Sequence, residues 1–233
     1  MDHRINYRLV LDVETANTLE DPLPYDIGIC VADKRGNIYE RRSYAVRELF
    51  IDERAMMRSA YYADKLPSYS EEIRAGQRKL DNFFTIRRKI FALMEEYNIT
   101  EVYAYNARFD ITALNNLTRW LTGSRSRYFF PANITVKCIW NMACQTICQR
   151  KTYRDFCEAY IFLANNDKNY KTSAEIVYRY LTLNPDFEEE HKGIDDVNIE
   201  TSIMAACYAS HKAMPHGQGI RRNCWQDVKR TMS

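Results

Sequence analysis

The chain has 233 residues, of which 46% are hydrophobic and 27% charged, a composition typical of a globular protein with one large domain or two small ones. Its formal net charge of +2 says little about partners, because a nucleic-acid enzyme need be basic only around its groove. No apolar run is long enough for a membrane span, the charged N-terminus is unlike a signal peptide, and seven scattered cysteines favour reduced, mostly buried thiols over a zinc site.

The first part of the chain predicts three strands, a helical stretch and a fourth strand. Residues 8–11 read as a buried strand, and residues 26–33 and 37–46 flank KRGN, which has the Gly and Asn of a tight turn. Short links between these strands suggest an antiparallel meander. From about 49 to 97 the apolar residues recur mainly at helical spacing, and 100–106 read as the fourth strand.

The second part of the chain is mostly helical. The expected elements are a helix over 110–121, a fifth strand over 133–139, and helices over 140–150, 153–165, 172–183 and 194–213. We predict a single α/β domain over residues 1–212, with a mixed five-stranded sheet flanked by helices. Residues 150–170 are the expected helical insertion or flap, and residues 213–233 are expected to form a polar, loosely held tail.

Acidic residues follow two of the predicted strands. In LVLDVETANT, Asp12 and Glu14 stand two residues apart, so alternation along a strand sends both to one side. Two adjacent carboxylates repel each other unless a cation lies between them, so the pair is either a solvated strand end or half of a divalent-metal site. Asp110 follows the fourth strand in the first turn of a helix, and it faces the pair if that strand runs parallel beside the first.

A third group of polar residues, HKGIDD, precedes and begins the last predicted helix. His191 lies on the preceding loop, where it could act as a general base. Asp195 and Asp196 are adjacent and about 100° apart on a helix, so only one can face the sheet well, and spacing does not choose between them. Basic residues that are either solvated helix faces or phosphate contacts are Arg87, Arg88, Lys89, Arg119, Arg125 and Arg127.

Taken in order, LDVET, NARFD and HKGIDD resemble the three motifs of the DnaQ-like (DEDD) 3′→5′ exonucleases, in the subgroup with His in the third motif. The resemblance runs from about residue 8 to residue 210 and implies a ribonuclease H-like fold. It implies that Asp12, Glu14, Asp110 and Asp196 hold two divalent ions, Mg²⁺ or Mn²⁺, with His191 as general base. The residues it places near the terminal nucleotide are Thr15, Ala16, Asn106 and Phe109.

The activity implied by the resemblance is removal of nucleoside 5′-monophosphates from the 3′ end of DNA, preferably single-stranded. One alternative is an exoribonuclease or oligoribonuclease of the same family, and another is a catalytically silent nucleic-acid-binding module. A different metal hydrolase would explain the carboxylates but not the spacing from His to Asp. We expect a cytoplasmic protein of a bacterial or phage-infected cell that could meet a replication or repair partner in trans; no pattern indicates an oligomeric state.

Overall fold

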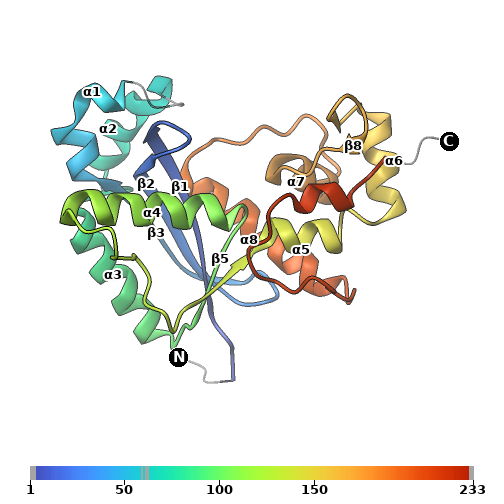
Figure 1. Cartoon of the computed structure of the whole chain (residues 1–233), viewed down its shortest axis with the longest axis horizontal. Coiled ribbons are helices and arrows are strands. Elements are labelled where there is room, and N and C mark those ends of the chain that lie inside the picture. The colour runs from blue at the N-terminus through green and yellow to red at the C-terminus, as the bar shows by residue number, and fades with distance from the viewer. Residues whose placement is uncertain (1–3, 59, 61–62, 231–233) are drawn as a thin grey trace.

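A six-stranded mixed sheet lies at the centre of the computed structural model, which describes residues 4–58, 60 and 63–230 (Figure 1). Its strands are β1 (Arg8–Asn17), β2 (Pro22–Ala32), β3 (Ile38–Val46), β4 (Lys79–Asp81), β5 (Glu101–Ala104) and β6 (Thr135–Cys138). Their order across the sheet is β4-β3-β2-β1-β5-β6. Strands β1, β2 and β3 form the predicted antiparallel meander, and β5 runs parallel to β1, as does β6 to β5.

Two features of the sheet differ from the prediction. Strand β4 is a sixth strand inside the stretch expected to be helical, because Leu80 pairs with Ala45 at the edge of β3. Pairing with a distant strand therefore overrides the local helical pattern. Strand β1 continues to Asn17, so Asp12 and Glu14 lie within a strand rather than beyond its end, and the register against β2 shifts just after Glu14.

The predicted helical stretch over 49–97 is helical only in part. It is divided into the π-helical turn η1 (Glu48–Asp52), α1 (Arg54–Met57), the 3₁₀ turn η2 (Ala63–Lys65), α2 (Leu66–Arg74) and α3 (Phe83–Glu96). Gly76 follows α2 with a φ of +74°, a left-handed conformation that ends a helix and suits glycine. Positions 59, 61 and 62 of this stretch lie outside the described residues.

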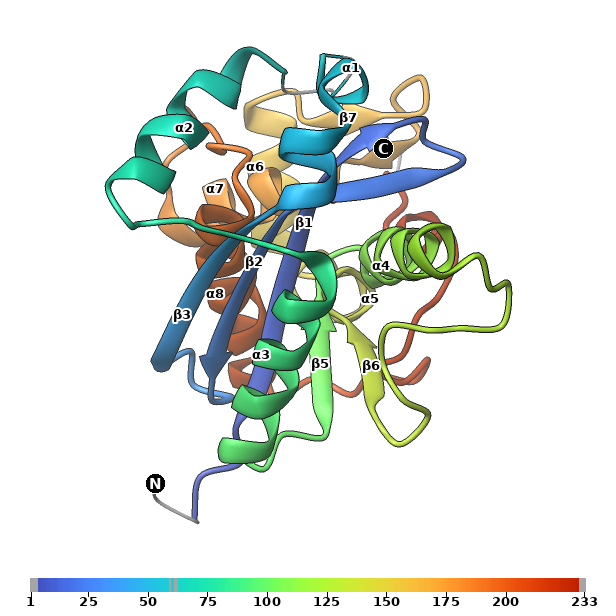
Figure 2. The same cartoon turned by 90° about the vertical axis from the view of Figure 1, so that its left-hand side faces the viewer.

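Helices cover both faces of the sheet (Figure 2). The remaining helices are α4 (Ala107–Thr122), α5 (Ile139–Gln145), α6 (Lys151–Ala159), α7 (Ala174–Thr182), α8 (Gly193–Ala209) and the 3₁₀ helix η3 (Cys224–Asp227). Helices α3 and α4 share a core with Leu9 and Leu11 of β1, whereas α5, α7 and α8 share a core with Val10. Because side chains alternate along a strand, Asp12 and Glu14 point toward the α8 face, on the same side as Val10.

The segment between β6 and α8 holds three helices, α5, α6 and α7, as the sequence predicts. The helix expected over 153–165 is shorter, because Ile161 has a φ of +57° and the chain turns into a hairpin. Its two strands are β7 (Leu163–Ala164) and β8 (Asn169–Tyr170). Residues 150–170 thus hold α6 and both strands of this hairpin, and their role as an insertion or flap stays a prediction.

The C-terminal residues 213–230 are packed against the domain, so the expectation of a loosely held tail is wrong for this part of the chain. The backbone N–H of Cys138 donates to the carbonyl of Gln218 at 2.8 Å, which ties the segment to the end of β6. Farther on, Cys224 and Val228 are fully buried in the core shared by α5, α7 and α8. Apolar residues spaced within a polar sequence therefore anchor the segment.

Two further expectations concern membranes and cysteines. Among the described residues, no helix has the length and apolar character needed to cross a membrane. All seven cysteines fall within the described ranges, and each is buried and free of disulfide bonds, which confirms the prediction of buried thiols.

Candidate active site

The two first-motif carboxylates project from β1 toward the start of α8. Asp12 lies opposite Gly28 of β2, and Glu14 lies opposite Asp26 of the same strand. The Oδ2 atom of Asp12 is buried and has no hydrogen-bond partner among the described residues. An anionic oxygen in that position is unstable unless it gains a proton or a cation.

A close contact between two glycines brings α8 onto these strands. A Cβ atom on Gly28 would lie 2.0 Å from the carbonyl carbon of Gly193, and a Cβ on Gly193 would lie 3.1 Å from the carbonyl oxygen of Asp12. No larger residue fits at Gly28 without moving one of the two backbones. The first turn of α8, which carries the third motif, therefore rests directly on β1 and β2.

Asp110 reaches the same place from the other side of β1. The parallel strand β5 ends at Ala104, and α4 begins at Ala107, so Asp110 lies in the first turn of α4 beyond the end of the strand. Its Oδ1 atom accepts a hydrogen bond from the backbone N–H of Val13 at 3.3 Å. That N–H lies between Asp12 and Glu14 in sequence, so the arrangement expected for parallel strands is present.

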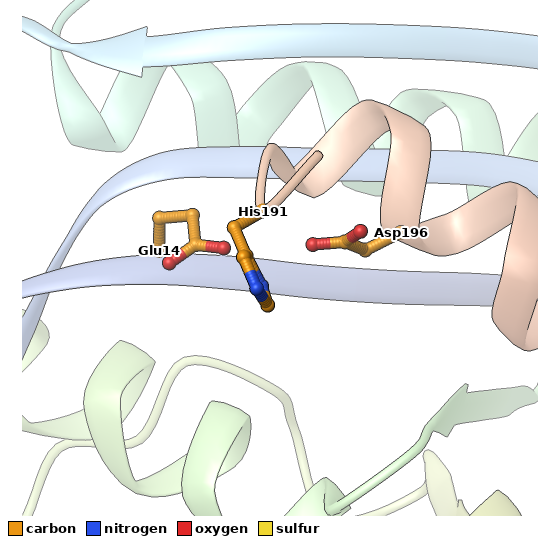
Figure 3. A group of neighbouring side chains, drawn as sticks. All are labelled: Glu14, His191 and Asp196. Atoms are coloured by element: carbon orange, nitrogen blue, oxygen red, sulfur yellow. The ribbon is translucent and has the colours of Figure 1, made fainter. Parts of the chain in front are cut away.

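The third motif completes a group of metal-ligating side chains. Glu14, His191 and Asp196 each offer a ligand atom, and these atoms lie within 4.8 Å of one another. Figure 3 shows Glu14 on β1, His191 on the loop before α8 and Asp196 in the first turn of α8, with the imidazole between the two carboxylates in this view. Asp196 is 8% exposed, whereas Asp195 is more exposed and lies outside this group.

Burial and mutual repulsion make the carboxylates of this site weak acids. Burial, with help from Asp196 and other carboxylates, raises the pKa of Glu14 to about 9. Burial raises the pKa of Asp196 to about 8 and that of Asp110 to about 7. The pKa of Asp12 is also raised, by burial and then by the surrounding carboxylates. Without a cation, the site therefore holds protons near neutral pH, and a divalent ion would replace them.

A lysine that sequence reasoning missed lies beside the site. Lys65 in η2 donates a hydrogen bond to the carbonyl oxygen of Glu190, next to His191. Its positive charge partly offsets the burial that raises the pKa of Glu14 and Asp196. The pKa of His191 is lowered by burial and then by Lys65, which keeps the imidazole neutral at neutral pH.

A chain of buried polar contacts holds the loop that carries His191. Asp26 of β2 accepts a hydrogen bond from the backbone N–H of Gly193 at 3.0 Å and pairs with the buried Arg78. Arg78 also donates to Glu72 of α2 at 2.9 Å, and Glu72 pairs with Lys192 at 2.5 Å. These residues are far apart in sequence, and no local pattern announces their contacts.

Glu200 is a fifth buried carboxylate that the sequence analysis did not select. It lies one turn after Asp196 on α8, is 3% exposed, and has an Oε2 atom without a hydrogen-bond partner among the described residues. Its charge raises the pKa of Asp12, second only to burial. The spacing of four residues from Asp196 was a usable signal, because such residues share a helix face.

The four residues expected near the terminal nucleotide differ in exposure. Ala16 is buried, and Thr15 is partly buried on β1 just after the register shift. Asn106 is exposed at the start of α4, and Phe109 is partly buried one residue before Asp110. The last two line one cavity of about 400 Å³. The nucleotide contacts themselves stay predictions.

Several of the basic residues noted in the sequence are engaged within the fold. Arg87 donates to the carbonyl oxygen of Phe129 at 2.7 Å, and Lys89 pairs with Asp81 at 2.5 Å. These contacts tie α3 to neighbouring segments. They favour a structural role for the α3 cluster over contact with phosphates.

Comparisons with known proteins identify the fold. No family model matches the chain, and none of the curated proteins matches it. Among solved structures, E. coli exonuclease I in complex with a 5cy-dT13 oligonucleotide is 14% identical, with a TM-score of 0.51 over 88% of this chain and 40% of that one. A product-bound exonuclease I is 16% identical, with a TM-score of 0.52 over 89% and 44% of the two chains.

A third similar structure, an ExoI/SSB-Ct complex, is 15% identical, with a TM-score of 0.53 over 89% of this chain and 42% of that one. Identities this low show a shared fold, and they confirm the predicted α/β, ribonuclease H-like architecture of a mixed sheet flanked by helices. The chain spans about two fifths of the length of the three structures, so the similarity concerns part of those proteins.

Proposed function

We propose that the chain is a metal-dependent 3′→5′ exonuclease that removes nucleoside 5′-monophosphates from the 3′ end of DNA, preferably single-stranded. The observation that carries the proposal is the convergence of Glu14, His191 and Asp196 from two distant segments into one group of potential ligands. The order of the three motifs and the fold shared with exonuclease I, one of whose structures holds an oligonucleotide, support it further.

The donor atoms of this site fit hard divalent cations. The candidate ligands Asp12, Glu14, Asp110 and Asp196 supply carboxylate oxygens, which suit Mg²⁺ or Mn²⁺. Buried oxygens of Asp12 and Asp196 have no hydrogen-bond partner among the described residues, as expected of atoms that await a cation. When bound, two such ions would supply positive charge that activates the attacking water and stabilises the leaving 3′ oxygen.

His191 is the proposed general base. Because its pKa is lowered by burial and by Lys65, the neutral imidazole is available to accept the proton of the attacking water. Its Nδ1 atom lies 3.8 Å from Oε2 of Glu189, which can orient the ring. The loop contacts through Gly193 and Lys192 hold the base over the carboxylates.

The test is a degradation assay on 5′-labelled single-stranded DNA and RNA of one sequence, with Mg²⁺, Mn²⁺ or EDTA. We expect a metal-dependent ladder that shortens from the 3′ end, with DNA degraded faster than RNA. Asp12→Asn should abolish the ladder, whereas Glu95→Gln, a change of an exposed carboxylate on α3, should leave it intact. Faster loss of RNA would favour the exoribonuclease, and no cleavage with any metal would favour a silent binding module.

A partner protein is a secondary part of the proposal. One solved structure with this fold is an ExoI/SSB-Ct complex, and a replication or repair protein could meet the present chain in the same way. Size-exclusion chromatography of the chain with candidate single-strand-binding proteins would test this.

A further inference from the structure

A cavity of about 400 Å³ lies at the N-terminal end of α4, the helix whose first turn carries Asp110. Asn106, Arg108 and Phe109 of the first turn line it, and Asp110 is the next residue along the helix. The first turn of α4 therefore carries both lining residues of the cavity and a candidate metal ligand.

The C-terminal segment forms another wall of this cavity, through Arg221, Arg222 and Asn223. Contacts on both sides hold these residues in place. Before them, Asn141 donates to the carbonyl oxygens of Gly217 and Gly219 at 3.2 and 3.0 Å. After them, Cys224 is fully buried. A segment with a polar sequence is thus fixed against α5 with its arginines beside α4.

The cavity combines cations with aromatic rings. Arg108 and Arg222 are exposed, and neither pairs with a carboxylate of the described residues, whereas Arg221 is paired with Asp227. Glu20 is the one carboxylate among the described lining residues. The net charge of the lining is therefore positive.

Two rings line the same space. Phe109 is partly buried, and Trp140, at the start of α5, is held by a hydrogen bond of 2.9 Å from its Nε1 to Oγ1 of Thr172. A small anion would make no use of the rings, and an apolar ligand would make no use of the guanidinium groups. A single-stranded nucleic acid uses both, because its phosphates need cations and its unpaired bases need flat apolar surfaces.

We propose that this cavity, which we call the tail groove, binds the strand upstream of the scissile phosphodiester. Arg108 and Arg222 contact backbone phosphates, and Phe109 or Trp140 stacks on a base. The C-terminal segment is thereby a part of the substrate-binding surface. The inference rests on the proposed function for the identity of the ligand, and it adds Trp140 and Arg222, which none of the three motifs contains, to Arg108 and Phe109 of the second motif.

The experiment compares Arg108→Ser and Arg222→Ser with Arg35→Ser, a change of an exposed arginine in the turn between β2 and β3. Binding of a 5′-fluorescent single-stranded oligonucleotide is measured in EDTA, so that no strand is cut, at several salt concentrations. Each lost phosphate contact should weaken binding about fivefold to tenfold at low salt and reduce the slope of log K against log salt by about 0.7. Arg222→Lys should restore most of the affinity, because the charge remains.

A second readout separates the tail groove from the catalytic site. The variants are tested with Mn²⁺ on the oligonucleotide and on the p-nitrophenyl ester of thymidine 5′-monophosphate, which is too short to extend upstream. The ratio of the two kcat/KM values should fall about tenfold in Arg108→Ser and Arg222→Ser and stay constant in Arg35→Ser.

The outcomes are distinguishable. Wild-type affinity, salt slope and kcat/KM ratio in both groove variants would overturn the tail groove, even if the protein proved to be an exonuclease. A different result would be that the wild-type protein cleaves neither substrate, while both groove variants bind the oligonucleotide more weakly than the wild-type protein does. In that case the exonuclease proposal fails and the tail groove stands.

Discussion

Replacing Glu14 by Gln should make the metal-free protein more stable at alkaline pH. The unfolded chain ionises this carboxyl above its ordinary pKa of 4.5, whereas the folded protein holds the proton up to about pH 9. Rising pH therefore favours the unfolded chain throughout this interval, because the folded state binds one proton more. Because glutamine does not titrate, Glu14→Gln removes this difference in bound protons between the folded and unfolded states.

The size of the effect follows from the shift in pKa. One proton of difference changes the free energy of unfolding by about 1.4 kcal/mol per pH unit. Between pH 5 and pH 8, the wild-type protein should lose about 4 kcal/mol of stability through Glu14 alone, as an upper value. Asp110 and Asp196, whose pKa values are raised to about 7 and about 8, add to the same slope in both proteins.

Urea unfolding in EDTA at pH 5, 6, 7 and 8 measures this difference. We expect Glu14→Gln to match the wild-type protein near pH 5 and to exceed its stability by a few kcal/mol at pH 8, by about 3 as a central value. Mn²⁺ should stabilise the wild-type protein more and more as the pH rises. It should stabilise the variant much less at each pH. Glu95→Gln on α3 serves as the exposed control. Equal pH slopes in Glu14→Gln and wild type would refute the burial argument.

Three other changes test the geometry of the site. His191→Ala should keep the thermal shift produced by Mn²⁺ but lose turnover by about 10²-fold to 10⁴-fold in the degradation assay; lost metal affinity would make the imidazole a ligand instead. Asp196→Asn should reduce Mn²⁺ affinity and turnover far more than Asp195→Asn, and the reverse order would show that the third motif is read one residue out of register. Gly28→Ala should lower the free energy of unfolding by about 3 kcal/mol, seen as a lower urea midpoint, because the added methyl meets the start of α8. Gly219→Ala, with no atom within 4 Å of the added Cβ, is its control, and an equal midpoint in the two variants would contradict the close contact.

The predictable part of the site comes from short-range rules. Alternation along a strand put Asp12 and Glu14 on one side, and that rule holds wherever the strand ends, so it survived the extension of β1 to Asn17. The place of Asp110 at the start of a helix followed equally from neighbouring residues. The short links between strands likewise identified the meander, and hydrophobic periodicity identified helices that cover the sheet.

Contacts between distant residues decided the rest. Spacing along α8 did not decide whether Asp195 or Asp196 faces the sheet. In the structure, α8 packs against Gly28, and Asp196 is the buried one of the two. Strand β4 forms because a free edge of β3 is available to it, against its helical surroundings. The C-terminal segment looked loose because its anchors, Cys224 and Val228, are isolated apolar residues whose partners lie elsewhere in the chain.

Some charged residues of the site can be recognised from sequence, and others are brought there only by packing. The motif carboxylates could be recognised from their order, and Glu200 from its spacing of four residues from Asp196, but the position of Lys65 beside them could not be located without the packing of η2. A local pattern specifies the direction of a side chain relative to its own strand or helix. The neighbours that it meets depend on how those elements pack, and burial among those neighbours is what raises the pKa of Glu14 and creates a demand for a cation.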